Sequence, residues 1–408
     1  MVKKHRNHGL DGLKDYTEGI EGYKKTEVGV IPHDWEVDSI TKYCQEIFLG
    51  LTAKVDYVNH GGIPLIRATD ISNGKLSFQN ALFISNKQHK QLTKYRKAKL
   101  GDVLVSKSGS LGVCALVDTE KEFSIYESII VLQPILNKLF SRFLLYLVSF
   151  QDTQKRLLGE TVGSTVGHLN LNNFKQLQIP LPPLPEQKAI AQSLSDFDTL
   201  ITALDQVITK KRNIKQSTMQ QILTGKKRLP GFSDEWDVKK LGDVLKVRHG
   251  KSQHHVVDQN GEFPILATGG EIGRAKTYLY NKPSVLIGRK GTIDIPQYMD
   301  SPFWTIDTLF YTDILNNAFP KFIFYRFNLI NWYSYNEASG VPSLNAKTIE
   351  NIEIKLSSVE EQKAISQVLS DMDAEIEALE KKRDKYKTIK QGMMQELLTG
   401  KTRLISSS

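Results

Sequence analysis

The sequence predicts an α+β protein in which two similar α+β domains are separated by two long helices that pair as an antiparallel coiled-coil spacer. Three observations lead to this prediction: a long helical segment occurs twice, each copy follows a stretch of short apolar runs and glycine-bearing turns, and both stretches open on a similar tryptophan motif. A repeat of this length indicates two similar halves joined end to end, with a pseudo-twofold internal repeat.

The repeated segment runs from Glu186 to Leu229 and again from Glu361 to Leu404, and 25 of the 44 aligned pairs are identical. Apolar residues in each copy recur at steps of four and three, which is the seam of a coiled coil. The seam consists of Ile190, Leu194, Phe197, Ile201 and Leu204 in the first copy, and of Ile365, Leu369, Met372, Ile376 and Leu379 in the second. Because an apolar seam needs a partner, we expect the two copies to pack on each other. The alternative is that each helix packs on its own domain.

Residues at the ends of both copies are typical of helix boundaries. Pro185 suits a first helical turn, Ser358 with Glu361 predicts a capping box, and Gly225 and Gly400 suit the position just after a helix. A helix of about 37 residues would be about 55 Å long. The chain is thus divided into an N-terminal arm (1–30), a first domain (31–180), a first helix (181–229), a second domain (230–355) and a second helix (356–408).

Similar landmarks lie near the start of both domains. Trp35 in IPHDWEV corresponds to Trp236 in FSDEWDV, and Pro64 corresponds to Pro264, each before two aliphatic residues. The offset between the halves falls from 201 at the tryptophans to 175 at the helices, so the first domain is 26 residues longer. The domains have therefore diverged more than the helices that follow them.

Composition narrows the class of protein. The 408 residues allow two or three domains, and a net charge of +9 with a pI near 9.1 favours a polyanionic partner. Cys44 and Cys114 form no disulfide or metal pattern and suit a reducing cytoplasm. No apolar run reaches membrane length, and the first residues lack the apolar core of a signal peptide. We expect a cytoplasmic protein without a membrane partner.

The sequence contains no persuasive catalytic or metal-binding set. The GKS at 250–252 lacks the earlier glycine of a phosphate-binding loop. His254 and His255 have no cysteine or histidine pair at zinc spacing, so a solvated loop is favoured there. We find no Ser-His-Asp or Cys-His arrangement. We therefore predict no catalytic residues, no metal site and no cofactor in this chain, which favours a binding or organising role.

Glycine-bearing turns after two matching apolar strands are the candidate nucleic-acid contacts. GDVLVSKSGSLG (101–112) in the first domain corresponds to PSVLIGRKGTID (283–294) in the second. Glycine lets backbone amides approach a ligand, while lysine, arginine and hydroxyl groups donate to phosphates or base edges. The alternative is a hairpin turn with solvated charges. The candidates here and in weaker neighbouring matches are Arg67, Thr69, Lys107, Ser108, Ser110, Arg248, Lys251, Thr268, Arg289, Lys290 and Thr292.

A basic run, NKQHKQLTKYRKAK (86–99), contains six lysine or arginine residues and no acidic residue. It is either a phosphate-contacting face or a solvated helix. We take KVRHGKSQHH (246–255) and TGGEIGRAK (268–276) as its counterparts in the second domain.

The motifs PLPPLPEQKAIAQSLSDFD and MQQILTGKKRL, with their second copies, resemble the specificity subunit of type I restriction–modification systems. The openings IPHDWEV and FSDEWDV and the turns GDVLVSKSGSLG and VLIGRKGTI are also similar to that family's target-recognition domains. The resemblance extends from Val30 to the end of the sequence. It implies a DNA reader without catalysis of its own, in which each recognition domain reads one half of a split site.

The resemblance also implies partners. Its two helices would set the spacing between the half-sites and dock two methyltransferase subunits, and restriction subunits would join that complex. S-adenosylmethionine, ATP and magnesium would then belong to the partner subunits. The tandem tetrapeptide repeat of some relatives is absent, since ITAL (201–204) and IEAL (376–379) each occur once. The gap between half-sites therefore stays open, as do the bases that are read.

Geometry independently favours a spacer between two readers. Two readers on one face of a duplex need centres about 34–36 Å apart, a distance that long helices can set and a flexible linker cannot. Two alternatives remain at this point. One is a DNA nuclease or methyltransferase with unrecognised catalytic residues, and the other is a coiled-coil scaffold that binds only proteins, which would show no salt-dependent DNA binding.

Overall fold

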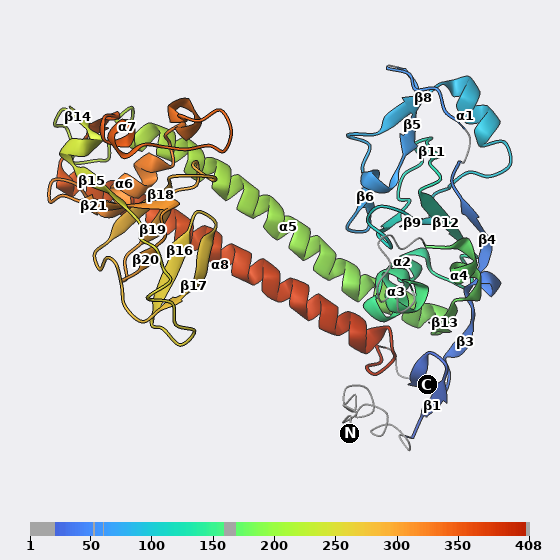
Figure 1. Cartoon of the computed structure of the whole chain (residues 1–408). Coiled ribbons are helices and arrows are strands. Elements are labelled where there is room, and N and C mark those ends of the chain that lie inside the picture. Colours follow the sequence, from blue (N-terminus) through green and yellow to red (C-terminus); the bar gives the residue numbers. More distant parts are fainter. Residues whose placement is uncertain (1–20, 52–53, 60, 159–168, 405–408) are drawn as a thin grey trace, which may run out of the picture. The chain divides into compact units, whose positions relative to one another are not determined.

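The computed structural model describes residues 21–404, except 52–53, 60 and 159–168 (Figure 1). The chain forms two compact units, and each unit combines segments from both halves of the sequence. Unit 1 comprises Met1–Thr202 with Asp384–Ser408, and unit 2 comprises Ala203–Arg383. The boundaries cut through both long helices, α5 (Leu184–Ile222) and α8 (Val359–Leu397). Each unit thus holds one part of each helix.

Unit 1 is built on a four-stranded antiparallel sheet in the order β10–β9–β12–β4. In a second, three-stranded sheet, β5 pairs parallel with β11 and antiparallel with β8. The short pairs β1–β2, β3–β13 and β6–β7 complete the unit. The strands are β1 (Tyr23–Thr26), β2 (Gly29–Pro32), β3 (Glu36–Ser39), β4 (Cys44–Leu49), β5 (Ile63–Ile66), β6 (Ile71–Ser72), β7 (Lys75–Leu76), β8 (Leu82–Ile84), β9 (Val103–Ser106), β10 (Cys114–Leu116), β11 (Ser124–Ile125), β12 (Ile129–Pro134) and β13 (Gln178–Leu181).

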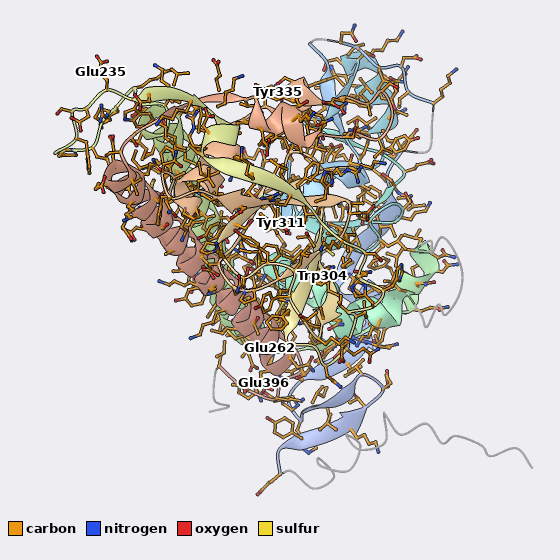
Figure 2. All side chains as sticks on the ribbon, turned by 60° about the vertical axis from the view of Figure 1, so that its left-hand side comes forward. Glu235, Glu262, Trp304, Tyr311, Tyr335 and Glu396 are labelled. Atoms are coloured by element: carbon orange, nitrogen blue, oxygen red, sulfur yellow. The ribbon has the colours of Figure 1, made fainter. Side chains whose placement is uncertain are left out.

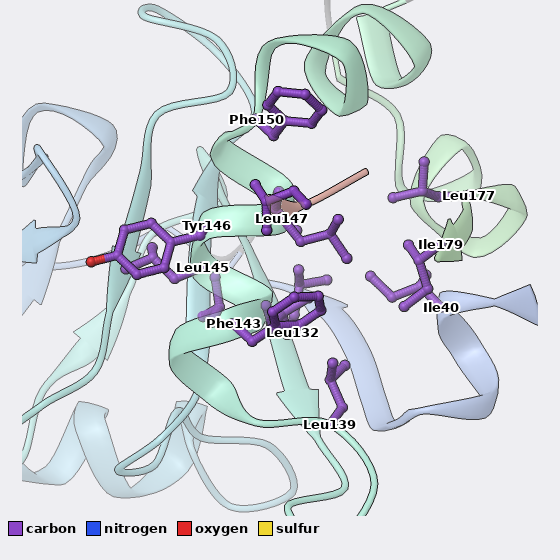
Figure 3. Packing of buried hydrophobic residues seen from close by; sticks show 14 of the residues in the cluster. Ile40, Leu132, Leu139, Phe143, Leu145, Tyr146, Leu147, Phe150, Leu177 and Ile179 are labelled. Carbon is purple, nitrogen blue, oxygen red and sulfur yellow. The ribbon is translucent and has the colours of Figure 1, made fainter. Parts of the chain in front are cut away.

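Short helices cover the four-stranded sheet of unit 1 and close its main core. Phe143 and Leu147 of the apolar helix α2 are fully buried there, together with Leu132 from β12 and Ile179 from β13 (Figure 3). Burial of such side chains contributes about 1.5–3 kcal/mol each. The helices are η1 (Ile40–Lys42), η2 (Ala68–Asp70), α1 (Asn86–Leu92), α2 (Ser141–Ser149), α3 (Gln151–Leu158) and α4 (Leu171–Gln176).

Unit 2 repeats this topology. Its four-stranded sheet has the order β15–β21–β18–β19, and in its three-stranded sheet β16 pairs parallel with β20 and antiparallel with β17. The antiparallel pair β14–β22 corresponds to the pair β3–β13 of unit 1. The elements are β14 (Asp237–Lys240), η3 (Leu241–Asp243), β15 (Leu245–His249), β16 (Phe263–Ala267), β17 (Gly270–Ala275), β18 (Ser284–Gly288), β19 (Gln297–Met299), β20 (Trp304–Thr305), β21 (Leu309–Ile314), α6 (Pro320–Phe327), η4 (Trp332–Tyr335), α7 (Ala346–Glu350) and β22 (Glu353–Leu356).

The matching topology shows which segments correspond. β4 is equivalent to β15, β9 to β18 and β12 to β21, because each pair occupies the same place in its sheet. The segment 246–255 therefore begins on the counterpart of β4, so the prediction that it corresponds to the basic run 86–99 is wrong. The segment 268–276 is also not its counterpart, since it forms β17, which corresponds to β8. The basic run is an insertion between β8 and β9.

The predicted seam of the long helices has two kinds of environment. Ile190 and Leu194 are fully buried in the core of unit 1, and Ile365 and Leu369 are likewise buried in the core of unit 2. These four residues pack on the domain of their own unit, as in the alternative we considered, and Met372 lies against the same core of unit 2. An amphipathic helix shows the same spacing whether it faces a domain or a second helix.

Farther along the seam, the residues face the other long helix. In unit 1, the rings of Phe197 and Tyr386 make an edge contact at 6.1 Å. In unit 2, Leu204, Ile208 and Ile376 are buried without belonging to a domain core, and Leu379 along the seam is half-buried. Ile201, in the α5 part of unit 1, is also half-buried. The ion pairs Asp205–Arg383 and Lys211–Glu375 flank this stretch at 3.4 and 2.6 Å. As residue numbers rise in α5 they fall in α8, so the helices pair antiparallel.

The last part of the predicted N-terminal arm (1–30) forms a hairpin. Residues 1–20 of the arm lie outside the described residues, and Tyr23–Thr26 pairs with Gly29–Pro32. The hydroxyl of Tyr23 donates to Gly400 O at 3.0 Å, which ties the hairpin to the end of α8 within unit 1. No helix in the described part of the chain combines the length and apolarity needed to cross a membrane.

Candidate nucleic-acid interface

In unit 1 the predicted contact segments meet at one stretch, 125–128, which we name the junction loop of unit 1. The backbone N–H of Lys107 donates to Ser128 O at 2.7 Å. The hydroxyl of Ser128 accepts a hydrogen bond from Ala68 N–H at 3.2 Å. A single residue therefore holds both the turn that contains Lys107 and the 67–69 turn, which are far apart in the sequence.

Unit 2 has an equivalent junction loop at 305–308. The backbone N–H of Arg289 donates to Thr308 O at 2.8 Å, and the backbone N–H of Lys251 donates to Thr305 O at 2.8 Å. The loop follows β20, just as the junction loop of unit 1 follows β11. Two predicted contact residues, Arg289 and Lys251, are thus positioned by the same four residues.

Lys107 and Arg289 occupy equivalent positions. Each residue directly follows one of the two inner strands of its four-stranded sheet, β9 in unit 1 and β18 in unit 2. Each carbonyl oxygen accepts a hydrogen bond from a leucine of a later loop, Leu169 at 3.2 Å for Lys107 and Leu344 at 2.9 Å for Arg289. The same frame therefore presents a lysine in unit 1 and an arginine in unit 2.

Two glycines allow the junction loops to form. A Cβ atom on Gly50 would lie 2.2 Å from Tyr126 O, and one on Gly250 would lie 1.9 Å from Ile306 O. A side chain at either position would push the loop away, so glycine is required for close approach. These glycines were not among the predicted residues. Their separation of 200 residues equals that of Pro64 and Pro264, which is the signal that would have revealed them.

The turns themselves depend on internal hydrogen bonds and on glycine. The Ser106 hydroxyl accepts from Val113 N–H at 2.9 Å and donates to the carbonyl of Ser110, closing the turn in unit 1. Ser110 is exposed and Ser108 is half-buried. In unit 2, Gly291 has a φ of +89°, which favours glycine, and Thr292 beside it is half-buried.

The charges of the two turns are available to an anion. Lys290 is exposed, while Lys107 and Arg289 are half-buried. Within the part of the chain that the structure describes, no carboxylate pairs with any of these three side chains. Arg289 Nη1 donates only to the Asp307 carbonyl at 3.3 Å, a long contact that leaves most of its donors free.

Two other predicted arginines are already engaged. Arg67 Nε bonds Asp70 Oδ2 at 3.2 Å and its Nη2 bonds Asn80 O at 3.1 Å, so its guanidinium holds the local turn together. Arg248 is more open, with its side chain 54% exposed and a 3.9 Å contact to Asp313. Arg248 is therefore freer than Arg67 to contact a ligand.

The remaining candidates surround the same loops. Thr69 is exposed beside Arg67, and Lys251 is exposed with its carbonyl oxygen accepting from Trp304 Nε1 at 3.0 Å. Trp304 is labelled in Figure 2. Thr268 Oγ1 lies 3.9 Å from the position that a Cβ on Gly291 would occupy. The structure thus gathers the unit 2 candidates, apart from Arg248 on β15, around one junction loop and its turn.

A buried carboxylate at the start of each long helix joins three segments. In unit 1, Glu186 Oε2 accepts from Trp35 Nε1 at 3.0 Å, and Arg403 binds both carboxylate oxygens at 2.6 and 2.8 Å. In unit 2, Glu361 accepts from Trp236 Nε1 at 2.9 Å and Arg228 binds both oxygens at 2.7 and 2.8 Å. We name these sets clasps.

The clasp explains why the expected capping box is incomplete. Ser358 accepts from the N–H of Glu361 at 3.3 Å, as predicted, but the Glu361 side chain binds Arg228 and Trp236. The arginine of each clasp comes from the segment just beyond the end of the long helix that did not supply its glutamate. Bidentate arginine–carboxylate pairs have a defined geometry, so each clasp fixes where one helix ends against the other's start.

A second repeated contact, the Tyr–Asp–Lys triad, fixes the helix pair farther along. In unit 1, Asp198 accepts from Tyr146 OH at 2.7 Å and from Lys390 Nζ at 2.6 Å. In unit 2, Asp373 accepts from Tyr325 OH at 2.8 Å and from Lys215 Nζ. Burial and the bonded aspartate raise the pKa of Tyr146, so its hydroxyl stays protonated and donates.

The described residues contain no group of three or more histidine, cysteine, aspartate or glutamate side chains that could hold a metal ion. Both thiols are buried, which raises the pKa of Cys44 and of Cys114 to about 12. A thiol with so high a pKa is not a nucleophile near neutral pH. The features that occur in both units are a basic turn on an equivalent frame and a clasp at the start of a long helix.

Two equivalent domains joined to paired helices define a protein of two similar halves. Sequence comparison identifies the family: the type I restriction modification DNA specificity domain matches residues 32–216 and again residues 233–388. The chain belongs to the family of type I restriction–modification specificity subunits. As such it is a non-catalytic component of a type I restriction–modification system.

Relatives match this chain over nearly their full length. The chain is 30% identical over 424 aligned positions to the MjaX specificity subunit of Methanocaldococcus jannaschii, which is assigned to a type I restriction enzyme, and covers 99% of that protein. It is 25% identical to the MjaVIII specificity subunit of the same organism, covering 96% of it. The fold is similar to that of the specificity subunit from M. genitalium, with a TM-score of 0.59, 18% identity, and coverage of 89% of this chain and 96% of the other.

Proposed function

We propose that the chain is the DNA-reading subunit of its complex and that each unit reads one half of a bipartite double-stranded DNA site. The observation that carries this proposal is the equivalence of Lys107 and Arg289, which stand on the same frame in two units. Equivalent frames would place both turns alike on DNA, while different side chains would read different bases. Arginine presents its donors to guanine in a rigid planar fork, whereas lysine is a compact charge with three rotatable donors.

The long helices would dock two methyltransferase subunits and set the spacing between the half-sites. On α5, Leu200, Val207 and Ile214 are 38%, 42% and 43% exposed and recur at every seventh residue, so they share one face of the helix. An apolar row on a solvated helix favours a partner helix. The close similarity of the segment ends, QQILTGKKRL (220–229) and QELLTGKTRL (395–404), favours two copies of one partner.

Other components of the system follow from these assignments. Restriction subunits would join the same complex. S-adenosylmethionine, ATP and magnesium would be bound by the partner subunits, which would carry out methylation and cleavage. The cytoplasm, where DNA is accessible and thiols such as Cys44 stay reduced, would be the site of action.

The test is to map methylated adenines in DNA from cells with and without the gene. We expect methylation at a motif of two defined halves separated by a gap of constant length, and its loss when the gene is removed. An unchanged methylation map, or a single continuous motif without a gap, would contradict the proposal. A scaffold that binds only proteins also predicts no sequence-selective, salt-dependent DNA binding by the assembled complex.

A further inference from the structure

The basic insertion of unit 1, Asn86–Lys99, has no counterpart in unit 2. In unit 1, β8 ends at Ile84 and β9 begins at Val103, whereas the equivalent strands of unit 2, β17 and β18, are joined by the shorter segment 276–283. The insertion forms α1 and then an extended segment. The insertion is therefore not part of the fold that the two units share.

The insertion is fixed at several points. Ser85 caps α1 by accepting from Gln88 N–H at 3.2 Å, and His89 is buried with its Nδ1 2.8 Å from Ser124 Oγ. After α1, Lys97 O accepts from Gln133 Nε2 at 3.1 Å. Between these anchors, residues 94–97 are all exposed. The segment is thus a held, outward-facing tip, which we name the basic tip.

The basic tip consists of Lys94, Tyr95, Arg96 and Lys97. Tyr95 is 85% exposed, and Lys94 Nζ lies 5.1 Å from the centre of its ring. Arg96 pairs with Glu46 and lies over the Phe48 ring at 5.8 Å. Within the described part of the chain, neither Lys94 nor Lys97 is paired with a carboxylate. Exposed cations beside an exposed aromatic ring are typical of nucleic-acid contacts.

The basic tip lies beside the junction loop. Tyr95, Arg96 and Lys97 of the basic tip line a pocket of about 490 Å³ together with Gly50, Leu51 and Ile125, among other residues. Ile125 begins the junction loop, whose Ser128 holds Lys107. The basic tip and the Lys107 turn are therefore attached to one rigid frame within unit 1.

From these observations we infer that the basic tip is an additional phosphate-backbone contact, made by unit 1 only, on the DNA duplex whose bases the Lys107 turn meets. This inference rests on the proposed DNA-reading function. Lys94 and Lys97 donate to phosphates, and Tyr95 packs against the sugar. Because these contacts are to the backbone, they raise affinity alike for every sequence and do not alter base choice. The complex consequently holds its two half-sites unequally.

The test compares Lys94→Gln/Lys97→Gln with the matched control Lys138→Gln/Lys175→Gln. All four lysines are exposed in unit 1, and each double variant removes two positive charges. Binding of the assembled specificity–methyltransferase complex to its bipartite duplex is measured over a range of salt concentrations. We expect the Lys94/Lys97 variant to make the negative slope of log K against log salt shallower by about 1.8 and to weaken binding about tenfold or more at about 0.1 M salt. The control should match the wild type.

Two further readouts locate the contact. Arg289→Ala leaves base choice unchanged in one half-site, and that half is assigned to unit 1. Hydroxyl-radical footprinting of the Lys94/Lys97 variant should show lost protection only there. Competition with randomised DNA should show unchanged base preference in both halves. A salt slope and footprint equal to those of the control would overturn the inference, as would reduced assembly with methyltransferase at unchanged DNA affinity. If the wild-type complex fails to discriminate its site from scrambled DNA, the proposed function itself has failed.

Discussion

Arg403→Met is predicted to destabilise unit 1 through the clasp. The guanidinium contacts both oxygens of Glu186, whose side chain is only 2% exposed, and also bonds Asp34 at 2.9 and 2.8 Å. Its removal leaves a buried carboxylate with Trp35 Nε1 as the one remaining donor among the hydrogen bonds that the described residues make to it. Methionine retains most of the side-chain volume, so the change tests the charge and its hydrogen bonds.

The magnitude follows from burial. Breaking a buried ion pair by removing one partner costs about 3–5 kcal/mol, whereas the more exposed Asp34 pair contributes about 0.2–1 kcal/mol. Because the Arg403 side chain is 22% exposed, water can reach part of the site, and we expect a loss of about 3 kcal/mol. The double variant Glu186→Gln/Arg403→Met strands no charge and should be clearly more stable than Arg403→Met alone.

Hydrogen exchange measured by mass spectrometry is the appropriate assay, because it separates the two units. We expect faster exchange in the Tyr23–Pro32 hairpin, in the 34–39 segment and in residues 384–404, with exchange in unit 2 peptides distant from α5 and α8 unchanged. Wild-type exchange throughout unit 1 would refute the clasp as a stabilising contact. Equally faster hydrogen exchange in both units would show that the destabilisation by Arg403→Met is not confined to the clasp of unit 1.

Three further predictions follow from the described contacts. Asp198→Lys alone should weaken pairing of α5 with α8 by replacing an attractive contact with Lys390 by a repulsive one, and adding Lys390→Asp should restore it; thermal melting and complex assembly measure both effects. Lys107→Ala and Arg289→Ala should each relax base choice in a different half-site, with Arg289→Ala losing about 1–3 kcal/mol of discrimination, and competition with libraries randomised in one half at a time tests this. The hydrogen bond from Arg403 lowers the pKa of Asp34 below 3.8 in the folded protein. The stabilisation from this ion pair is therefore fully present above about pH 3.8 and is lost as the pH falls through the pKa that Asp34 has in the folded state. Acid titration should show that the free energy of unfolding falls less in the Arg403→Met variant than in the wild type.

The helices and their boundaries could be predicted from the sequence because their signals are local. The repeat, the heptad steps and the glycines at 225 and 400 mark α5 and α8 closely, and both glycines adopt the left-handed conformation, with φ of +73° and +72°. What faces each seam residue is not local. Leu194 and Leu204 have the same spacing and chemistry, yet the first lies in a domain core and the second does not.

The candidate interface was predictable only in part. The equivalence of Lys107 and Arg289 followed from matching apolar strands, which keep their pattern although the loops diverge. The junction loops were not predicted, because each is defined by hydrogen bonds between segments about 20 to 60 residues apart, such as Ala68 to Ser128. Likewise, the Trp35, Glu186 and Arg403 side chains of the clasp meet only in the folded chain, and no spacing in the sequence connects them.

The contribution of residues 384–404 to unit 1 has a consequence for the order of events during synthesis. Trp35 and Pro32 are among the first described residues to leave the ribosome, but a Cβ on Gly400 would lie 2.4 Å from Pro32 Cδ, which shows how closely the late segment packs on the early one. At about 5–20 residues per second, roughly 10–40 s separate the end of the first stretch of unit 1 from the segment that completes it. During that interval the residues of unit 2 are being synthesised, and Glu186 of unit 1 has no arginine partner. The nascent first unit therefore exposes a surface that residues 384–404 cover later, and slow translation of the second half would lengthen that exposure.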